Sequence, residues 1–341
     1  MISKWVFFFI NLGSKIGGKI MKKSIRNKVV SIVGVILAST VLVACGSNED
    51  TGADDDTVNI GVLQFMEHNS LTAAKDGFVD ELEKEELTFE IDLMNSQGDQ
   101  SNLQSMSEQL AKNNELILAI ATPAAQSLAT VEQEKPVLFT AVTDAEDAGL
   151  VESNDAPGGN LTGTSDMVPI DKQIALLLSI VQDAKTIGLI YNSSEPNSEI
   201  QANLAIEALE AAGIDARVAT VTTTNDVQQV LTSLAQEVDG IYIPTDNTLA
   251  STAATVGEIA IEYQLPVVTG STDQVEAGAL ATYGINYEDL GRQTAQIALE
   301  ILRNDGDPAS IAVELSNNLQ LVINEEMAEA LGIDPASITV D

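Results

Sequence analysis

The sequence predicts an α/β protein with two doubly wound parallel-sheet lobes, and three observations support this prediction. From Val58 onward, short runs rich in Ile, Val and Leu alternate with longer stretches of helical periodicity. This alternation is typical of parallel strands that are covered by helices on both faces. After "GGNLTGTSD" (residues 158–166) the alternation begins again, which indicates a second unit of the same kind. The chain has 341 residues, 45% of them hydrophobic, enough for two ordinary domains.

Each element is predicted from its own pattern, in chain order. In the first half, strands are predicted at 58–64, 88–95, 115–121 and 136–142, with helices at 70–85, 100–113 and 124–133. In the second half, strands are predicted at 186–192, 215–221, 239–244, 265–270 and 278–285, with helices at 169–183, 199–213, 226–236 and 250–264. A helix at 287–304 and a mixed segment at 314–332 complete the chain. The result is two similar halves in succession.

The two halves are expected to be joined by more than one strand. One join lies near Gly163, and the chain crosses back near Gly284. We therefore expect one lobe from residues 58–165 plus about 285–312, and a second from 166–284 plus about 313–341. Such a multi-strand hinge would leave a cleft between the lobes.

The segment before the folded body has the layout of a secretory signal. Residues 21–44 begin with basic side chains, continue as an apolar run and end in Leu-Val-Ala before Cys45, the chain's single cysteine. A transmembrane anchor is the alternative interpretation. Residues 1–20 fit no part of a signal, so a translation start at Met21 is the alternative to a start at Met1. Residues 45–57 are small, polar and acidic, as in an extended tether.

Polar loops follow the predicted strands, at the sheet edge where open α/β sheets bind ligands. These loops are "QFMEHNS", "ATPAAQ" and "AVTD" in the first half, and "YNSSEPNS", "PTDN" and "TGSTD" in the second. Capping of helix N-termini by the same residues is the competing explanation. A free amino acid suits the loops, because helix N-termini and hydroxyls can hold its carboxylate, while Asp144, Asp246 or Glu67 can hold its ammonium group. Phe65, Tyr191, Tyr283 and Tyr287 are candidates for stacking on the ligand or for the core.

Seven segments in fixed order resemble a known family. They are "IGVLQFMEHNSLTAAKDGF", "ATPAAQ", "VTDAEDAGLV", "GGNLTGTSD", "IGLIYNSSEPNS", "PTDN" and "YGINYEDLG". Together they are similar to the tryptophan- and tyrosine-binding lipoproteins of a Gram-positive ABC importer family. The resemblance implies a type I periplasmic-binding-protein fold. It also implies a lipid on Cys45, since "LVAC" resembles a lipobox, and it implies as partners a permease and a cytoplasmic ATPase.

The resemblance also implies which residues bind the ligand. In the first lobe they are Glu67, His68, Thr122, Ala124, Gln126, Thr143 and Asp144; in the second lobe and near the hinge they are Tyr191, Ser193, Glu195, Asn197, Ser198, Asp246, Asn247, Tyr283 and Asn286. The expected ligand is an aromatic amino acid, with tryptophan first and tyrosine or phenylalanine next. We expect a monomer, without a cofactor, held by its lipid at the outer face of the cell membrane. The alternative is a lipid-anchored sensor, adhesin or binding protein for another small amino-acid-like solute, without transport.

Composition argues against other classes of function. Sixteen Lys and Arg face 51 Asp and Glu, and seven of the bases precede Cys45, so the folded body is strongly acidic. Nucleic-acid binding, which neutralises phosphates with basic side chains, is therefore not expected. One cysteine and one histidine (His68) cannot form an ordinary zinc site. No G-x-S-x-G motif is present, so we expect no hydrolase of that kind, and no enzyme.

Overall fold

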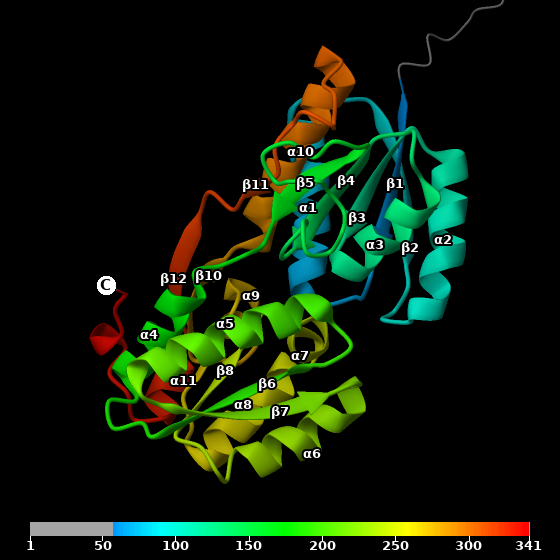
Figure 1. Ribbon diagram of the computed structural model, residues 1–341. Coiled ribbons are helices and arrows are strands. Elements are labelled where there is room, and N and C mark those ends of the chain that lie inside the picture. The colour runs from blue at the N-terminus through cyan, green and yellow to red at the C-terminus, as the bar shows by residue number, and fades with distance from the viewer. Residues whose placement is uncertain (1–56, 341) are drawn as a thin grey trace, which may run out of the picture. The chain divides into compact units, whose positions relative to one another are not determined.

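We describe the protein from a computed structural model, which defines residues 57–340. The predicted signal at 21–44, Cys45 and the tether up to residue 56 lie outside the described residues. The described residues form one compact unit, in which two sheets, each with helices on both sides, make two lobes (Figure 1). Within residues 57–340, no helix combines the length and the apolar character that a membrane span requires.

The first lobe is built around a parallel six-stranded sheet with the order β11-β5-β4-β3-β1-β2. Its strands are β1 (Val58–Gln64), β2 (Phe89–Asn95), β3 (Leu116–Ile120), β4 (Val137–Val142), β5 (Leu161–Ser165) and β11 (Glu314–Leu315). Its helices are α1 (Asn69–Lys84), α2 (Gln100–Asn113), α3 (Thr122–Val131) and α10 (Tyr287–Asn304). Helices α2 and α3 cover one face, and α1 and α10 cover the other (Figure 1). Every residue of β3 and β4 is buried, as expected for central strands covered on both faces.

The second lobe has the sheet order β12-β10-β9-β8-β6-β7, in which only β12 runs antiparallel to its neighbour. Its strands are β6 (Thr186–Asn192), β7 (Asp215–Val221), β8 (Gly240–Ile243), β9 (Val267–Thr269), β10 (Ala281–Ile285) and β12 (Leu319–Ile323). Its helices are α4 (Ile170–Ile180), α5 (Pro196–Ala212), α6 (Thr224–Leu234), α7 (Asn247–Ser251), α8 (Ala253–Tyr263), α9 (Thr272–Glu276), α11 (Glu325–Ala330) and the 3₁₀ turn η1 (Pro335–Ser337). The two sheets confirm the predicted α/β class.

The chain passes between the two sheets three times: after β5, after β10 and after β11. The first two passages lie next to Gly163 and Gly284. Neither glycine has room for a Cβ atom, because it would meet backbone carbonyl oxygens of Phe139 and Gly270 respectively. The return to the second sheet follows β11, so residues 314–315 belong to the first sheet rather than to a second-lobe segment that begins at about 313.

The helix predicted at 250–264 differs from the one that forms. Helix α7 begins three residues earlier, at Asn247, and ends before Thr252, whose backbone (φ −115°, ψ 17°) is not helical; α8 then begins at Ala253. The Asp246 side chain accepts a hydrogen bond from the N–H of Leu249 at 2.8 Å, which caps α7 immediately after β8. Part of the predicted "PTDN" loop is therefore the start of a helix.

Candidate functional site

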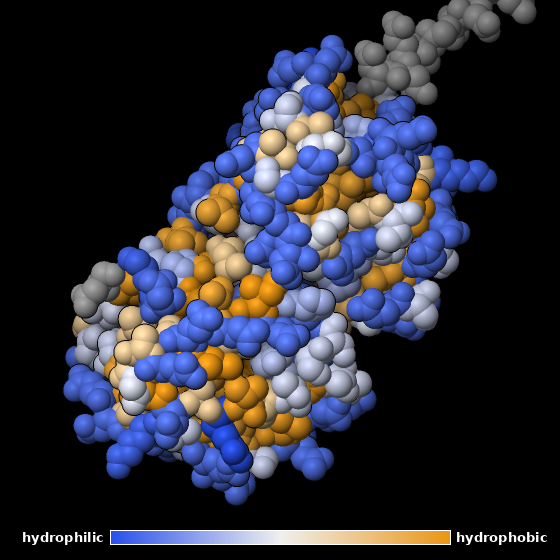
Figure 2. Space-filling view, in the orientation of Figure 1, coloured by the Kyte–Doolittle hydropathy of each residue, from blue (hydrophilic) through white to orange (hydrophobic). Residues whose placement is uncertain are grey.

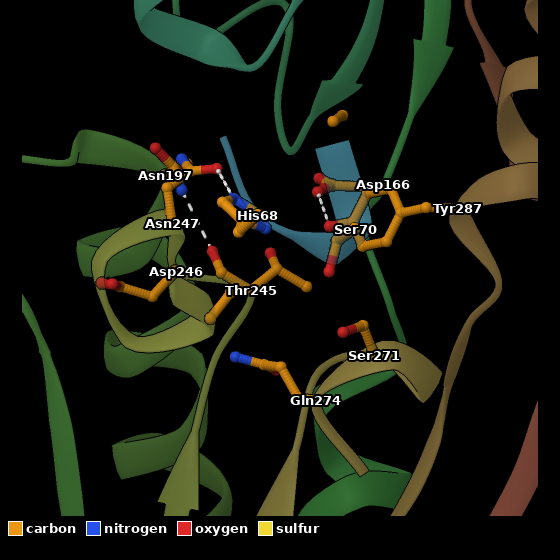
Figure 3. Close-up of a pocket in the computed structure, with 12 residues that line it drawn as sticks. His68, Ser70, Asp166, Asn197, Thr245, Asp246, Asn247, Ser271, Gln274 and Tyr287 are labelled. Atoms are coloured by element: carbon orange, nitrogen blue, oxygen red, sulfur yellow. Dashed lines mark hydrogen bonds between the residues drawn. The ribbon is translucent and has the colours of Figure 1, made fainter. Parts of the chain in front are cut away.

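A cavity lies where the strand ends of the two sheets meet (Figure 3). Its lining comes from both lobes and consists of His68, Ser70, Ala141, Asp166, Asn197, Thr245, Asp246, Asn247, Ala250, Ser271, Gln274 and Tyr287. The free volume of the cavity is about 10 Å³. The site is thus nearly shut, with room for about one water molecule.

Asp166 lies at one end of the cavity, directly after β5. Its Oδ1 accepts a hydrogen bond from the hydroxyl of Thr143 at 2.9 Å, and its Oδ2 accepts one from Tyr287 at 2.6 Å. Burial raises the pKa of Asp166, while these hydrogen bonds act in the opposite direction. No lysine or arginine lines the cavity. Asp166 is therefore a buried carboxylate without a cationic partner among the lining residues.

Asp246 also lines the cavity, but the second lobe already uses both of its oxygens. Its Oδ1 accepts the N–H of Leu249, and its Oδ2 accepts the N–H of Asn192 at 2.6 Å. Burial, followed by the neighbouring Glu195 carboxylate, raises the pKa of Asp246 to about 7. These contacts make Asp246 the link between β6 and the start of α7. This structural role competes with the expected role of Asp246 in binding the ammonium group of a ligand.

Glu195 lies behind this helix start and is 1% exposed. Its carboxylate accepts five hydrogen bonds: from the backbone and side chain of Asn247, from the backbone and hydroxyl of Thr248, and from the Asn192 amide. The first N–H groups of α7 are thereby occupied by a carboxylate of the protein itself. Helix α7 consequently has no free N-terminus to offer an anionic group of a ligand.

His68 joins the two lobes across the cavity. It precedes α1 in the first lobe, and its Nε2 lies 3.1 Å from Oδ1 of Asn247 in the second lobe. A second connection between the lobes is the hydrogen bond from the Gln201 amide of α5 to the Thr143 hydroxyl, at 3.1 Å. Burial lowers the pKa of His68 from 6.5 to about 4, so its imidazole is neutral at pH 7.

The backbone is strained on the first-lobe side of the cavity. Ala141 lines the cavity with φ 58°, a left-handed conformation that is uncommon for a residue with a side chain. The pairing of β4 with β5 shifts register between Phe139 and Val142, next to this residue. The irregularity lies two residues before Thr143, the residue that holds Asp166. Strain of this kind often accompanies binding sites.

The structure brings only part of the predicted residues to the cavity. His68, Asn197, Asp246 and Asn247 line it, and Thr143, Glu195 and Ser198 contact lining residues from behind. The others lie outside its lining. Glu67 and Ser193 are exposed, Tyr191 and Tyr283 are partly buried, and Ala124 is buried in the core. Thr122 is also buried, with its hydroxyl unpaired. The remaining three make local contacts: the Gln126 amide donates to the carbonyl of Ala148, Asp144 accepts the N–H groups of Glu146 and Asp147, and Asn286 caps α10.

Several lining residues were not on the predicted list: Ser70, Thr245, Ser271, Gln274, Asp166 and Tyr287. Asp166 carried a usable signal, because it ends "GGNLTGTSD" and follows a strand in the same manner as the loops that we did select. The sequence predicts Tyr287 as a candidate for stacking on the ligand or for the core, but not as a partner of Asp166. Gln274 and Ser271 belong to the short helix α9 and its cap, for which the sequence offers no periodic pattern.

The fold and the enclosed site define a solute-binding protein with two lobes of the type I periplasmic-binding-protein kind. Residues 59–338 match the family model described as ABC transporter substrate binding protein, and the chain belongs to this family. The Tyrosine-binding protein of Clostridioides difficile (strain R20291) is 35% identical over 321 residues, 90% of this chain and 92% of that protein.

Two solved structures extend the comparison. The ABC domain in complex with L-Trp from Streptococcus pneumonia is 38% identical, with a TM-score of 0.78 over 82% of this chain and 97% of that one. The ligand-free, open structure of a substrate binding protein with adhesive properties from Clostridium difficile is 39% identical, with a TM-score of 0.64 over 81% of this chain and 95% of that one. The TM-score is higher for the L-Trp complex than for the ligand-free, open structure, at nearly equal identity. The narrow cavity agrees with lobes that are drawn together.

Proposed function

We propose that this protein captures an aromatic amino acid between its two lobes and delivers it to the permease of an ABC importer. Tryptophan is the first candidate ligand, and tyrosine and phenylalanine are the next. The observation that carries this proposal is the buried Asp166 carboxylate, which faces a cavity with no lysine or arginine in its lining. A buried carboxylate is costly without a cation, and the ammonium group of an amino acid supplies one.

The carboxylate of the ligand requires N–H or O–H donors nearby. Ser70 lies in the first turn of α1 and Ser271 immediately precedes α9, and both line the cavity on the side of Asp166 (Figure 3). The N-terminal turn of a helix carries a partial positive charge, which suits a carboxylate even without a basic side chain. We therefore place both charged groups of the amino acid at the Asp166 end of the cavity. The side chain of the ligand then extends toward His68, Asn197 and Ala250.

The relatives support an aromatic ligand. One is named for tyrosine and another was solved with L-Trp, and both are more than 30% identical to this chain. Tyr287 supplies an aromatic ring in the cavity lining, next to Asp166. Because the cavity is nearly shut, the lobes must separate before a ligand of this size can enter.

A calorimetric screen of residues 46–341 against the twenty amino acids tests the proposal. We expect heat of binding with tryptophan or tyrosine, and none with aspartate, whose negatively charged side chain would lie against neutral or acidic lining groups. Failure of every amino acid to bind would overturn the proposed ligand class.

We further propose that a lipid on Cys45 holds the protein at the outer face of the cell membrane, where a permease and its ATPase are its partners. The support is the signal-like segment at 21–44 that ends at this cysteine. In cells that carry Cys45→Ser, we expect the protein in the medium or in unprocessed form, as detected by fractionation and immunoblotting. A processed form that stays with the membrane would contradict the lipid anchor.

A second candidate function is a lipid-anchored adhesin or sensor with the same binding site. The observation that favours it is a similar substrate binding protein that is described as having adhesive properties. Uptake of labelled tryptophan separates the two functions, since deletion of the gene lowers uptake only if the protein serves an importer. Adhesion of the deletion strain to host cells measures the other function.

A further inference from the structure

Two neutral atoms in the cavity are buried hydrogen-bond acceptors without a partner. They are Nδ1 of His68 and Oδ1 of Asn197. A buried acceptor that loses its water and gains no donor is unfavourable, so buried polar atoms are nearly always paired. Two such atoms in one cavity indicate that a guest supplies the donors.

The chemical state of His68 follows from its neighbours. The Asn247 amide donates to the Glu195 carboxylate at 2.6 Å, so its NH₂ group faces Glu195 and its Oδ1 faces His68. An oxygen can only accept, and therefore Nε2 of His68 carries the hydrogen. In a neutral imidazole the other nitrogen then has none, and Nδ1 is an acceptor. The lowered pKa of His68, which burial causes, keeps the ring in this neutral form.

The orientation of Asn197 is fixed in a similar way. Its amide nitrogen donates to the carbonyl of Thr245 at 3.1 Å, which leaves Oδ1 as the atom without a partner. The residue is 6% exposed, so solvent does not satisfy this oxygen. Gln274 also has an unpaired oxygen, but nothing anchors its amide nitrogen among the hydrogen bonds of the described residues, and it can rotate to present either atom.

One ammonium group cannot serve all of these acceptors. Asn197 and Asp166 lie on opposite sides of His68 (Figure 3). An ammonium group carries its three N–H donors on a single nitrogen, so all three stay close together. A carboxylate attracts this cation more strongly than a neutral imidazole or amide does. With the ammonium group at Asp166, the acceptor of Asn197 faces the side chain of the ligand.

We propose that His68 Nδ1 and Asn197 Oδ1 recognise a hydrogen-bond donor on the aromatic side chain of the ligand, either an indole N–H or a phenol O–H, and so exclude phenylalanine. This proposal rests on the proposed function and sharpens it. Sites that hydrogen-bond a polar group of a ligand reject the analogue that lacks it, because their own buried groups are left unpaired.

Pairs of ligands that differ in the donor alone test the proposal on the unaltered protein. Tyrosine and phenylalanine differ by one hydroxyl, and tryptophan and 3-benzothienylalanine differ by sulfur in place of the indole N–H. The pair that decides is the one whose donor-bearing amino acid, tyrosine or tryptophan, binds more tightly. In that pair, calorimetry should give a Kd at least tenfold higher for the analogue without the donor. Equal Kd values within that pair would overturn the proposal while leaving the proposed function intact. No binding by any of the four would instead overturn the proposed function.

Asn197→Leu removes one acceptor at similar side-chain size. We expect this variant to bind tryptophan more weakly and 3-benzothienylalanine about equally, so that the ratio of the two Kd values falls toward one. Asn102→Leu, on the exposed face of α2, is the matched control and should keep the ratio of the unaltered protein. A ratio that stays unchanged in Asn197→Leu would exclude Asn197 as the recognising residue. If the variant fails to fold, the ligand pairs on the unaltered protein still decide.

Discussion

Two carboxylates in the cavity have the same chemistry and opposite surroundings. Asp246 follows β8 and accepts the backbone N–H groups of Asn192 and Leu249 in its own lobe, whereas Asp166 follows β5 and accepts the side-chain hydroxyls of Thr143 and Tyr287. Backbone N–H groups must be satisfied for the lobe to fold, so the first carboxylate is committed to structure. The second is available to a ligand. Position after a strand therefore does not distinguish a binding acid from a capping one.

The largest expected effect concerns the free carboxylate. Asp166→Asn removes the negative charge that the ammonium group needs, and we expect the Kd for the amino acid to rise at least a hundredfold in calorimetry. The folded state should lose little stability, because a buried charge without a cation is itself unfavourable. The control is Asp144→Asn, in a residue that accepts N–H groups of its own loop outside the cavity lining. A similar loss of affinity in both variants would break the distinction between the two kinds of acid.

The capping carboxylate should show the reverse pattern. Asp246→Ala leaves the N–H groups of Asn192 and Leu249 without their acceptor, so we expect the free energy of unfolding to fall by about 2 kcal/mol. Urea denaturation measures this change. At temperatures where the variant remains folded, its Kd should change far less than that of Asp166→Asn. A hundredfold loss of affinity with unchanged stability would reassign Asp246 to the ligand.

A smaller effect is expected from His68, which the cavity holds in its neutral form. Its pKa is about 4 in the folded protein and about 6.5 when unfolded, so the unfolded chain binds more protons between these pH values. The stability of the protein should therefore decrease as the pH falls through this window, by about 2 kcal/mol between pH 7 and pH 5 from this residue alone.

His68→Gln should lack this contribution, which urea denaturation at both pH values can detect. The rise in the pKa of Asp246 acts in the opposite direction, but it is present in both proteins and cancels in their difference. An identical loss of stability on acidification in both proteins would show that His68 is not held neutral.

Local patterns were sufficient for the scaffold of this protein. The runs from Val58 to Gln64 and from Leu116 to Ile120 are strands because β-branched and leucine side chains fill both faces of a covered sheet. Gly163 and Gly284 lie inside β5 and β10, where a glycine marks a close approach of backbone. Helix α7 was less predictable, because its start depends on the Asp246 cap and its end on a non-helical Thr252.

The surface of the molecule also shows the limit of what local sequence patterns can predict. Figure 2 shows hydrophilic residues over much of the visible face of both lobes, with hydrophobic ones between them. The acidic composition predicts such a face, and it says nothing about where the binding cavity lies. The cavity is found only by bringing together loops that are more than a hundred residues apart, such as those of His68 and Asn247.

By itself, the sequence determined the α/β class, the two halves and the strand ends at which a ligand can bind, because each depends on hydrophobic periodicity and glycine placement within short segments. Only the tertiary structure decided which acid is committed and which is free. The partner of Asp246 at Asn192 is 54 residues away, and the partner of Asp166 at Tyr287 is 121 residues away. The surroundings of a buried charge are set by groups that meet it in space, and no local pattern records them.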